Sequence, residues 1–491
     1  MEFLKTYTPV LMVLVLLSFL RFCRVLDVPI FLDEATYLSF ADSIRNNPHN
    51  LFVSFPAAVL PVLPWFLALS YFIFGNAFNI FNVARILLTT TDIISAFFVF
   101  LIGRELVDKR FGFLSLILYM LIPLNFFHGR LIMLEPLMEM LFLIGLYFLI
   151  KIYKKIYDKK YSIKLILTSA LFLSLSFLTK PLALVSFGSL LFLPPFFILK
   201  RKVSVLMAMI KMIPAFFVFL FFTLLILPFA IVIFPGFENY HAIGGNNDVV
   251  FNFKQNLWRS YWWIKAYFPI PILFAIFFSS ILGLFKKDVL VVWFSLWALS
   301  VILIDSLVGT KFFPRHLFPV AAPASFLLAY LVYEIMALRR WMGFLALGFV
   351  LIPLLQKDLL ILSDAKNSGL ALEDKQQFYE DWTSGVGLAE IGSFLNSVSR
   401  REKITLFVEN DTLLTWALPN IYLEENVIVY PLPNHFPSSL NNFLENNSNT
   451  NINFILLNKT ADAPEDWPVF LILSQDKGPH RKINLYKYHQ K

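Results

Sequence analysis

The sequence is poor in charged residues and nearly lacks cysteine. Only 15% of its 491 residues are Asp, Glu, Lys or Arg, whereas a soluble domain carries roughly 25%. This low charge content excludes an ordinary soluble protein. The single cysteine, Cys23, excludes an intrachain disulfide and leaves the redox compartment undecided.

Apolar residues take the place of the missing charge. Hydrophobic residues make up 58% of the chain, which contains 56 Phe. The formal net charge is +8, but the basic residues form short clusters between apolar runs. This pattern is typical of cytoplasmic loops and not of a nucleic-acid-binding surface. The sequence therefore predicts an integral protein of the cell membrane, with the lipid bilayer as its surroundings and no nucleic-acid partner.

Apolar segments of roughly 17–25 residues predict transmembrane helices. About eleven are expected, near residues 8–24, 80–103, 111–127, 133–150, 163–179, 182–199, 205–234, 266–285, 289–308, 316–337 and 341–361. A further apolar stretch, 57–75, has Pro56, Pro61 and Pro64 around its start. These prolines favour an interfacial or re-entrant helix in the first outer loop over another span.

Basic clusters set the expected orientation, because Lys and Arg are in excess on the cytoplasmic side. With a cytoplasmic N-terminus, the clusters all fall inside, at 104–110, 151–164, 200–202, 286–287 and 339–340. Arg21 and Arg24, at the outer end of the first span, go against this rule. The sequence thus predicts a transmembrane domain at 1–362 and an extracytoplasmic domain at 363–491.

The predicted C-terminal domain has mixed secondary structure. Four segments are rich in β-branched and aromatic residues, as strands are: KITLFVEN, NINFILLN, PVFLILSQ and KINLYKYH. GLAEIGSFLNSVS has helical periodicity instead. The domain is therefore expected to be α/β or α+β.

Charged side chains also gather at the predicted outer ends of the spans. The candidate site residues are Asp33, Glu34, Arg130, Glu135, Lys180, Lys311, Arg315 and His316. Carboxylates can accept a proton from an attacking hydroxyl, and Lys and Arg can neutralise a phosphate. This set suits the transfer of a group from a lipid phosphate. It requires no cofactor, and nothing in the sequence supports a divalent metal.

Each of these residues also has a structural interpretation. Asp33 and Glu34 could cap the helix that follows them. Arg130 and Glu135 could form an intramembrane ion pair, and Lys180 could extend towards the membrane interface. Asp92, which follows three threonines, is expected to be a structural carboxylate satisfied by their hydroxyls.

Several segments resemble the membrane glycosyltransferases of the GT-C fold, in particular the dolichyl-phosphate-mannose protein mannosyltransferase and aminoarabinose transferase-like group. They are FLDEATYLSFADSI, HGRLIMLEPLM, SFLTKPLAL and KFFPRHLFPVAAP. The resemblance implies that Asp33 is the acid of the first outer loop and acts as a base. It also implies that Glu135 is the second acidic position, that Lys180 belongs to a recurring turn, and that Arg315 opens a late span.

The function predicted from this resemblance is inverting transfer of a sugar from a polyprenyl-phosphate donor. The acceptor would be a hydroxyl of a glycan, lipid or protein on the extracytoplasmic face. A lipid or glycan transporter or flippase without transfer chemistry is the alternative. Such a protein would more often show inverted repeats, and the sequence has no evident internal repeat.

Overall fold

The computed structural model describes residues 2–57, 59–74, 79–157, 162–188, 249–308, 312–433, 452–460, 462–479 and 481–489, together with a few single positions. The chain forms two compact units. We call the first the helical unit; it comprises Met1–Val25, His49–Phe66 and Ala84–Ala371. We call the second the mixed unit; it comprises Leu26–Pro48, Leu67–Val83 and Leu372–Lys491. Most of the segment 23–79 is thus grouped with the C-terminal part of the chain.

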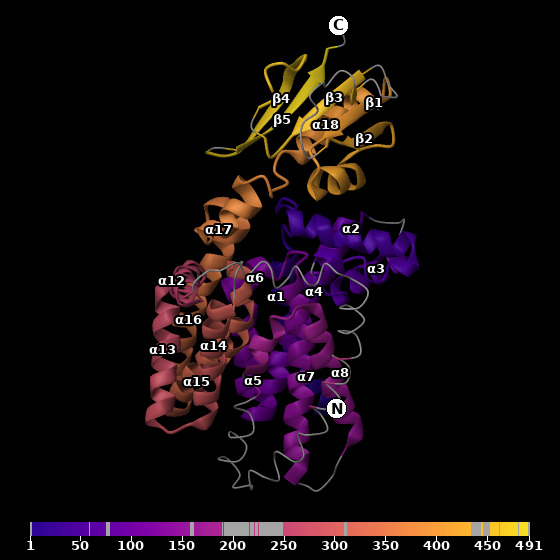
Figure 1. Cartoon of the computed structure of the whole chain (residues 1–491). Coiled ribbons are helices and arrows are strands. Elements are labelled where there is room, and N and C mark those ends of the chain that lie inside the picture. The colour runs from indigo at the N-terminus through magenta and orange to yellow at the C-terminus, as the bar shows by residue number, and fades with distance from the viewer. Residues whose placement is uncertain are drawn as a thin grey trace. The chain divides into compact units, whose positions relative to one another are not determined.

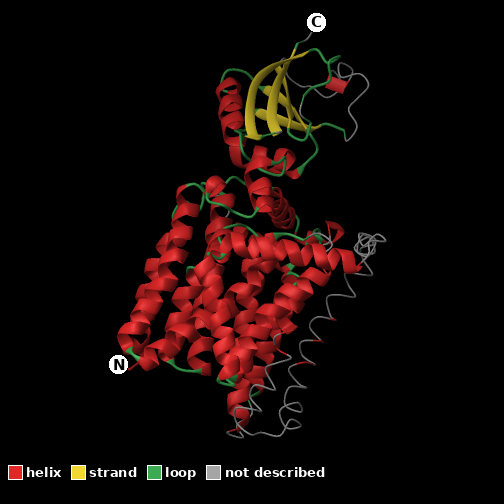
Figure 2. Ribbon diagram, turned by 90° about the vertical axis from the view of Figure 1, so that its left-hand side faces the viewer, coloured by secondary structure: helices red, strands yellow, loops and turns green. Residues whose placement is uncertain are grey.

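The helical unit is a bundle of helices that run side by side (Figure 2). Its helices are α1 (Glu2–Phe22), most of α4 (Ile80–Leu106), α5 (Lys109–Met120), α6 (Pro123–His128), α7 (Leu134–Tyr157), α8 (Ile163–Thr179), α12 (Val249–Tyr267), α13 (Ile270–Phe285), α14 (Val289–Val308), η4 (Pro314–Val320), α15 (Ala321–Leu338) and α16 (Arg340–Ser363). Helices α8 and α14 have the bounds that their apolar runs predict, and most others differ by a few residues at an end.

Proline explains one departure from the predicted spans. The span expected at 111–127 is two helices, α5 and α6, separated by Leu121 and Ile122. Pro123 begins α6 at its first position. Proline has no backbone N–H and its ring clashes with a preceding helical turn, so it starts a helix readily but cannot lie in the interior of one without cost.

A second departure lies in the predicted polar loop 235–262. Its described part belongs to α12, which meets α13 at a bend of 113°. Trp258, Tyr261 and Trp262 are exposed along α12. Aromatic side chains of this kind favour the membrane–water interface. The bend and the aromatic face therefore indicate an interfacial helix that leads into a span.

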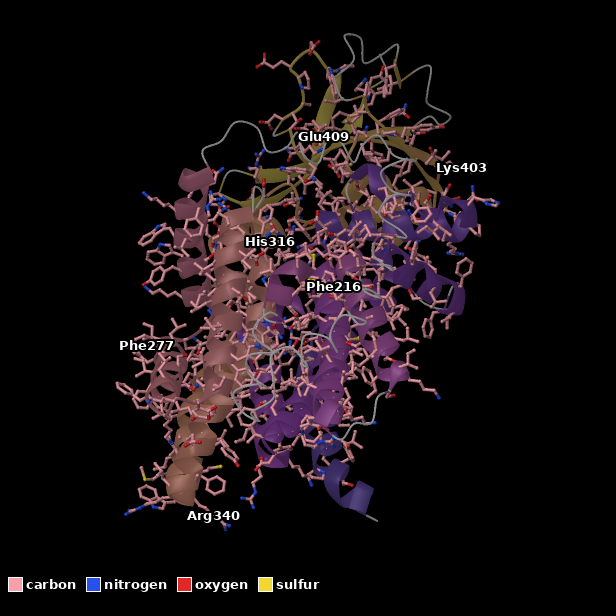
Figure 3. The ribbon with its side chains drawn as sticks, turned by 60° about the horizontal axis from the view of Figure 1, so that its bottom comes forward. Phe216, Phe277, His316, Arg340, Lys403 and Glu409 are labelled. Carbon is pink, nitrogen blue, oxygen red and sulfur yellow. The ribbon has the colours of Figure 1, made fainter. Side chains whose placement is uncertain are left out.

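Five described helices are long and apolar enough to cross a membrane, and a sixth if α12 and α13 together form one span. The spans expected at 182–199 and 205–234 lie mostly outside the described residues, so the total of about eleven stays a prediction. Exposed apolar side chains support a lipid environment. Phe274, Phe277 and Phe278 project from α13 (Figure 3, which labels Phe277).

Arg21 breaks the charge rule for a structural reason. Its side chain is fully buried and makes an ion pair with Asp92 of α4 at 2.9 Å. It also donates hydrogen bonds of 2.7 Å to the carbonyl oxygens of Met120 and Asn125. A buried charge must be paired and hydrogen-bonded, and Arg21 fastens the end of α1 to α4, α5 and α6 in this way.

The prediction that threonine hydroxyls satisfy Asp92 was wrong. Thr89, Thr90 and Thr91 each donate their hydroxyl to a backbone carbonyl of α4 itself. Asp92 instead pairs with Arg21, and it accepts a hydrogen bond of 3.2 Å from the Tyr119 hydroxyl. A threonine in a helix can satisfy its hydroxyl on the preceding turn, which leaves it unavailable to a neighbouring carboxylate.

The mixed unit contains a five-stranded sheet in the order β2-β1-β3-β5-β4 (Figure 1). The strands are β1 (Ile404–Val408), β2 (Val427–Pro431), β3 (Ile452–Leu457), β4 (Val469–Gly478) and β5 (Arg481–Tyr488). Strand β1 pairs in parallel with β2 and β3, while β5 pairs antiparallel with β3 and β4. The four predicted strand segments are confirmed as β1, β3, β4 and β5, and β2 is an addition.

Short helices accompany the sheet. They are α17 (Leu372–Lys375), η6 (Gln376–Glu380), α18 (Leu388–Ser399) and η7 (Leu413–Tyr422). The helix predicted from GLAEIGSFLNSVS is α18, and its Phe394 contacts Phe454 of β3 ring to ring. Phe407, Ile455 and Trp467 belong to the apolar core of the unit. The predicted small C-terminal domain with a sheet is confirmed.

The segment between α1 and α4 contributes α2 (Leu32–Asn46) and part of α3 (Val62–Phe74) to the mixed unit. Helix α2 begins where residues 30–32 run antiparallel to residues 383–385. The backbone N–H of Leu32 donates to Thr383 O at 2.9 Å, and the N–H of Gly385 donates to Ile30 O at 2.7 Å. Along its length, α2 packs against η7. The start of α2 is thus fixed on the C-terminal part of the chain.

Candidate functional site

A cluster of opposite charges lies in the helical unit at the ends of three elements distant in sequence. Glu135 is in the first turn of α7, Lys180 is the residue after α8, and Arg315 is in η4. The Lys180 Nζ lies 2.5 Å from Glu135 Oε1, and Arg315 Nε lies 3.8 Å from the same oxygen. We call these three residues the Glu135 cluster. Three of the predicted site residues therefore meet.

Local sequence explains why each member lies there. Glu135 precedes Pro136, so it stands in a first turn where an acid is favoured by the helix dipole. Lys180 precedes Pro181, which ends α8 and leaves the lysine in extended backbone. Pro314 begins η4, and Arg315 follows it.

The burial of the cluster strengthens the electrostatic interactions of its charged groups. The side chain of Glu135 is only 1% exposed, while those of Lys180 and Arg315 are 15% and 11% exposed. One carboxylate among two cations leaves a net charge of +1. A partly desolvated cationic group at the end of apolar helices can bind an anionic lipid headgroup.

Two further titratable residues lie within electrostatic range of the cluster. Asp305, near the end of α14, interacts with Lys180 and Glu135. Its side chain is buried, and neither carboxylate oxygen has a hydrogen-bond partner among the described residues. His316 interacts with Lys180 and Arg315, and also with His128.

The sequence interpretation missed Asp305 and also Glu139. Glu139 lies one helical turn after Glu135, is fully buried, and interacts electrostatically with Asp92. Neither of its carboxylate oxygens finds a hydrogen-bond partner in the described ranges. An acid inside an apolar run was the available signal for both residues, because intramembrane carboxylates are rare and usually functional or paired.

The sequence suggested Arg130 as a partner of Glu135, and the structure shows contacts of Arg130 after α1 and in α6. It donates a hydrogen bond of 2.7 Å to the carbonyl oxygen of Cys23. Its guanidinium and that of Arg21 each lie 5.1 Å from the centre of the Phe126 ring. Arg130 therefore helps Arg21 to hold the end of the first span. Lys311 lies outside the described residues.

The two acids that follow α1, Asp33 and Glu34, lie in the mixed unit and differ in their surroundings. Glu34 is fully buried, and its carboxylate accepts a hydrogen bond of 2.9 Å from the backbone N–H of Phe31. It thus satisfies a donor at the start of α2, as the capping interpretation expected. Asp33 is partly exposed. Of the two, Asp33 is the more accessible to solvent.

The Glu135 cluster and the basic pair at 339–340 mark opposite ends of the helical unit. Figure 3 shows His316 towards one end and Arg340 towards the other. Helix α15, with 18 residues, connects these two positions. Its length is about 27 Å at 1.5 Å per residue, close to the thickness of the hydrocarbon core.

Comparison with solved structures identifies the fold. ArnT from Cupriavidus metallidurans in the apo state is similar with a TM-score of 0.61 and 14% identity, over 97% of this chain and 98% of that chain. The same protein bound to undecaprenyl phosphate gives 0.59 and 13%, over the same shares. The Archaeoglobus fulgidus oligosaccharyltransferase in complex with Zn and sulfate gives 0.54 and 13%, over 90% of this chain and 67% of that chain. The chain has the GT-C fold.

A family match accompanies the shared fold. Residues 34–229, fewer than half of the chain, match the dolichyl-phosphate-mannose-protein mannosyltransferase family. No curated protein matches the chain. The fold and the family match together indicate a membrane-bound glycosyltransferase, so the predicted resemblance, fold class and enzyme class are confirmed.

Proposed function

We propose that this protein transfers a sugar from a polyprenyl-phosphate donor to an acceptor hydroxyl with inversion, and that Asp33 is the base. The Glu135 cluster carries this proposal. It is a buried group of net positive charge at one end of an apolar helical bundle. A lipid donor would place its apolar tail among the helices and its phosphate against Lys180 and Arg315. The complex of ArnT with undecaprenyl phosphate supports a lipid phosphate as the ligand.

The proposed reaction is a single displacement. Asp33 accepts the proton of the acceptor hydroxyl as that oxygen attacks the anomeric carbon of the sugar. The bond from the anomeric carbon to the phosphate oxygen breaks, and its electron pair stays on the phosphate. Lys180 and Arg315 stabilise the negative charge that develops on the departing polyprenyl phosphate. Attack from the side opposite the leaving group inverts the anomeric carbon.

Other residues take supporting roles in this proposal. Asp305 would accept hydrogen bonds from sugar hydroxyls, because its buried oxygens have no partner among the described residues. His316 and Arg130 would add donors near the phosphate, as the sequence suggested. Glu34 would support Asp33 by fixing the start of α2, through its bond to Phe31.

The proposed reaction face is extracytoplasmic. The support is the separation of the Glu135 cluster from Arg339 and Arg340 along α15, since basic pairs between spans favour the cytoplasmic side. The family match favours an enzyme over the transporter alternative.

The test is transfer of a radiolabelled sugar from a polyprenyl-phosphate donor by purified protein, with the Asp33→Asn variant in parallel. We expect Asp33→Asn to bind polyprenyl phosphate as the unaltered protein does and to lose transfer by about 100-fold or more, the contribution typical of a general base. The Glu390→Gln variant, altered in the first turn of α18, is the control. Full transfer by Asp33→Asn would exclude the base role.

A further inference from the structure

We propose that a buried hydrogen-bond network at the edge of the sheet positions Asp33, and that Lys477 is its central positioning residue. This inference rests on the proposed role of Asp33. All the residues concerned belong to the mixed unit.

Lys477 is an unusual residue for its place. It lies near the end of β4, where the pairing with β5 is interrupted by a register shift between Asp476 and Gly478. Its side chain is fully buried, and its Nζ donates to the carbonyl oxygen of Ser384 and to Asn458 Oδ1, the latter at 2.6 Å. Burying an ammonium group opposes folding unless its hydrogen bonds are satisfied.

Asn458 is itself held rigidly. It follows β3 directly, next to the end of β1, because these two strands are parallel and in register. Its backbone N–H donates to the Glu409 carboxylate at 2.5 Å, and its Nδ2 donates to Trp382 O at 2.8 Å. Glu409, labelled in Figure 3, also accepts hydrogen bonds from the backbone N–H and hydroxyl of Thr460. The loops after β1 and β3 therefore form one frame.

This frame binds the segment 382–385 from one side through hydrogen bonds. Asn458 holds Trp382, and Lys477 holds Ser384. On its other side the same segment pairs with residues 30–32, through Leu32 N–H to Thr383 O and Gly385 N–H to Ile30 O. Asp33 is the next residue after this pairing. A shift of the 382–385 segment would thus be transmitted to the base.

Stability alone explains Lys477 poorly. An apolar residue of similar size would avoid the desolvation of a charge, and such replacements are often neutral or stabilising. Burial also lowers the pKa of Lys477 to about 8, with Asp411 and Asp381 acting in the opposite direction. Its fixed hydrogen bonds to Ser384 and Asn458, and not its bulk, are what an apolar residue at this position could not supply.

Gly385 offers an independent way to disturb the same contact. A Cβ at this position would lie 2.5 Å from Ile30 Cγ2 and 2.7 Å from Ile30 O. Alanine would therefore push residues 30–32 away from the segment without touching Lys477. By contrast, a Cβ at Gly348 would meet nothing within 4 Å.

The experiment measures kcat and KM of sugar transfer for Lys477→Met and Gly385→Ala, with Lys482→Met and Gly348→Ala as matched controls. Lys482 is an exposed lysine of β5. We expect kcat to fall about 10- to 100-fold in both test variants, because a displacement of about 1 Å can cost that much. The KM for donor and the affinity for polyprenyl phosphate should stay within about two-fold, since the donor site is untouched.

The outcomes separate this inference from the function on which it rests. If Asp33→Asn retains full transfer, the proposed function fails. If Asp33→Asn is inactive while Gly385→Ala and Lys477→Met keep the kcat of their controls, the positioning role is refuted and the base role stands. Should Lys477→Met fail to fold, Gly385→Ala alone decides, because it leaves the buried network intact.

Discussion

Lys180→Met removes one cation from the Glu135 cluster and changes its net charge from +1 to 0. At an effective dielectric constant of about 20, two unit charges about 4 Å apart interact by about 4 kcal/mol. This is an upper bound on what one cation contributes to phosphate binding, and it corresponds to about 1,000-fold in affinity. We expect Lys180→Met to weaken binding of polyprenyl phosphate about 100- to 1,000-fold.

The same substitution strands a buried carboxylate. Glu135 is 1% exposed and would keep only Arg315, whose Nε lies 3.8 Å away. Breaking a buried ion pair by removing one partner costs about 3–5 kcal/mol of the free energy of unfolding. The variant should therefore be less stable as well as weaker in binding.

A second substitution separates charge from stability. Glu135→Gln should raise the net charge of the cluster to +2 and tighten the binding of polyprenyl phosphate. The double variant Glu135→Gln/Lys180→Met returns the net charge to +1 and leaves no carboxylate unpaired. We expect it to regain most of the affinity and thermal stability that Lys180→Met loses.

The assay is isothermal titration of polyprenyl phosphate into protein in lipid nanodiscs, with thermal unfolding measured on the same samples. Lys286→Met is the control, because Lys286 forms a comparable ion pair with Glu334 but is 45% exposed. An exposed pair contributes about 0–1 kcal/mol. If Lys180→Met and Glu135→Gln change the affinity in the same direction, the electrostatic reasoning is wrong.

Three further predictions concern other parts of the chain. Asp92→Asn leaves Arg21 buried without its counter-ion and should lower the free energy of unfolding by about 3 kcal/mol. Glu105→Gln, in a more exposed ion pair, should change the free energy of unfolding by about 1 kcal/mol or less. Thermal unfolding in detergent compares the two variants. The pKa of Lys477 falls from 10.5 to about 8 on folding. Between these pH values the folded mixed unit therefore binds fewer protons than the unfolded chain does. Its stability should rise by about 3 kcal/mol from pH 8 to pH 10.5 relative to Lys477→Met, and equal slopes in denaturant titrations would contradict this. A cysteine in place of the exposed Lys403 (Figure 3) should react with an impermeant reagent in sealed cells, and protection there would overturn the proposed orientation.

The apolar pattern of the sequence determined most of the helices. The bounds of α8 and α14 follow from their apolar runs, because a helix in a bilayer must satisfy its own backbone and needs a fixed length of apolar residues. Composition likewise predicted the segments that form β1, β3, β4 and β5, because they are rich in β-branched and aromatic residues. These are local properties, so one sequence is enough to show them.

The sequence also nominated Glu135, Lys180 and Arg315, since charged residues at the ends of apolar helices are conspicuous. It could not assign their partners. Arg130 was a candidate partner of Glu135 because charges inside a membrane tend to pair, and the structure shows it donating a hydrogen bond to the carbonyl oxygen of Cys23. Threonine hydroxyls were the predicted partners of Asp92, but they donate to backbone carbonyls of their own helix.

Partner choice depends on where the ends of helices distant in sequence meet, and no local pattern encodes that. Only the folded chain brings Lys180 to Glu135 across 45 positions, or Arg21 to Asp92. The same holds for the segment 383–385 beside Leu32, some 350 residues away in the chain. Hydropathy and helix signals are properties of neighbours in sequence, whereas charge pairing and the setting of Asp33 are properties of neighbours in space.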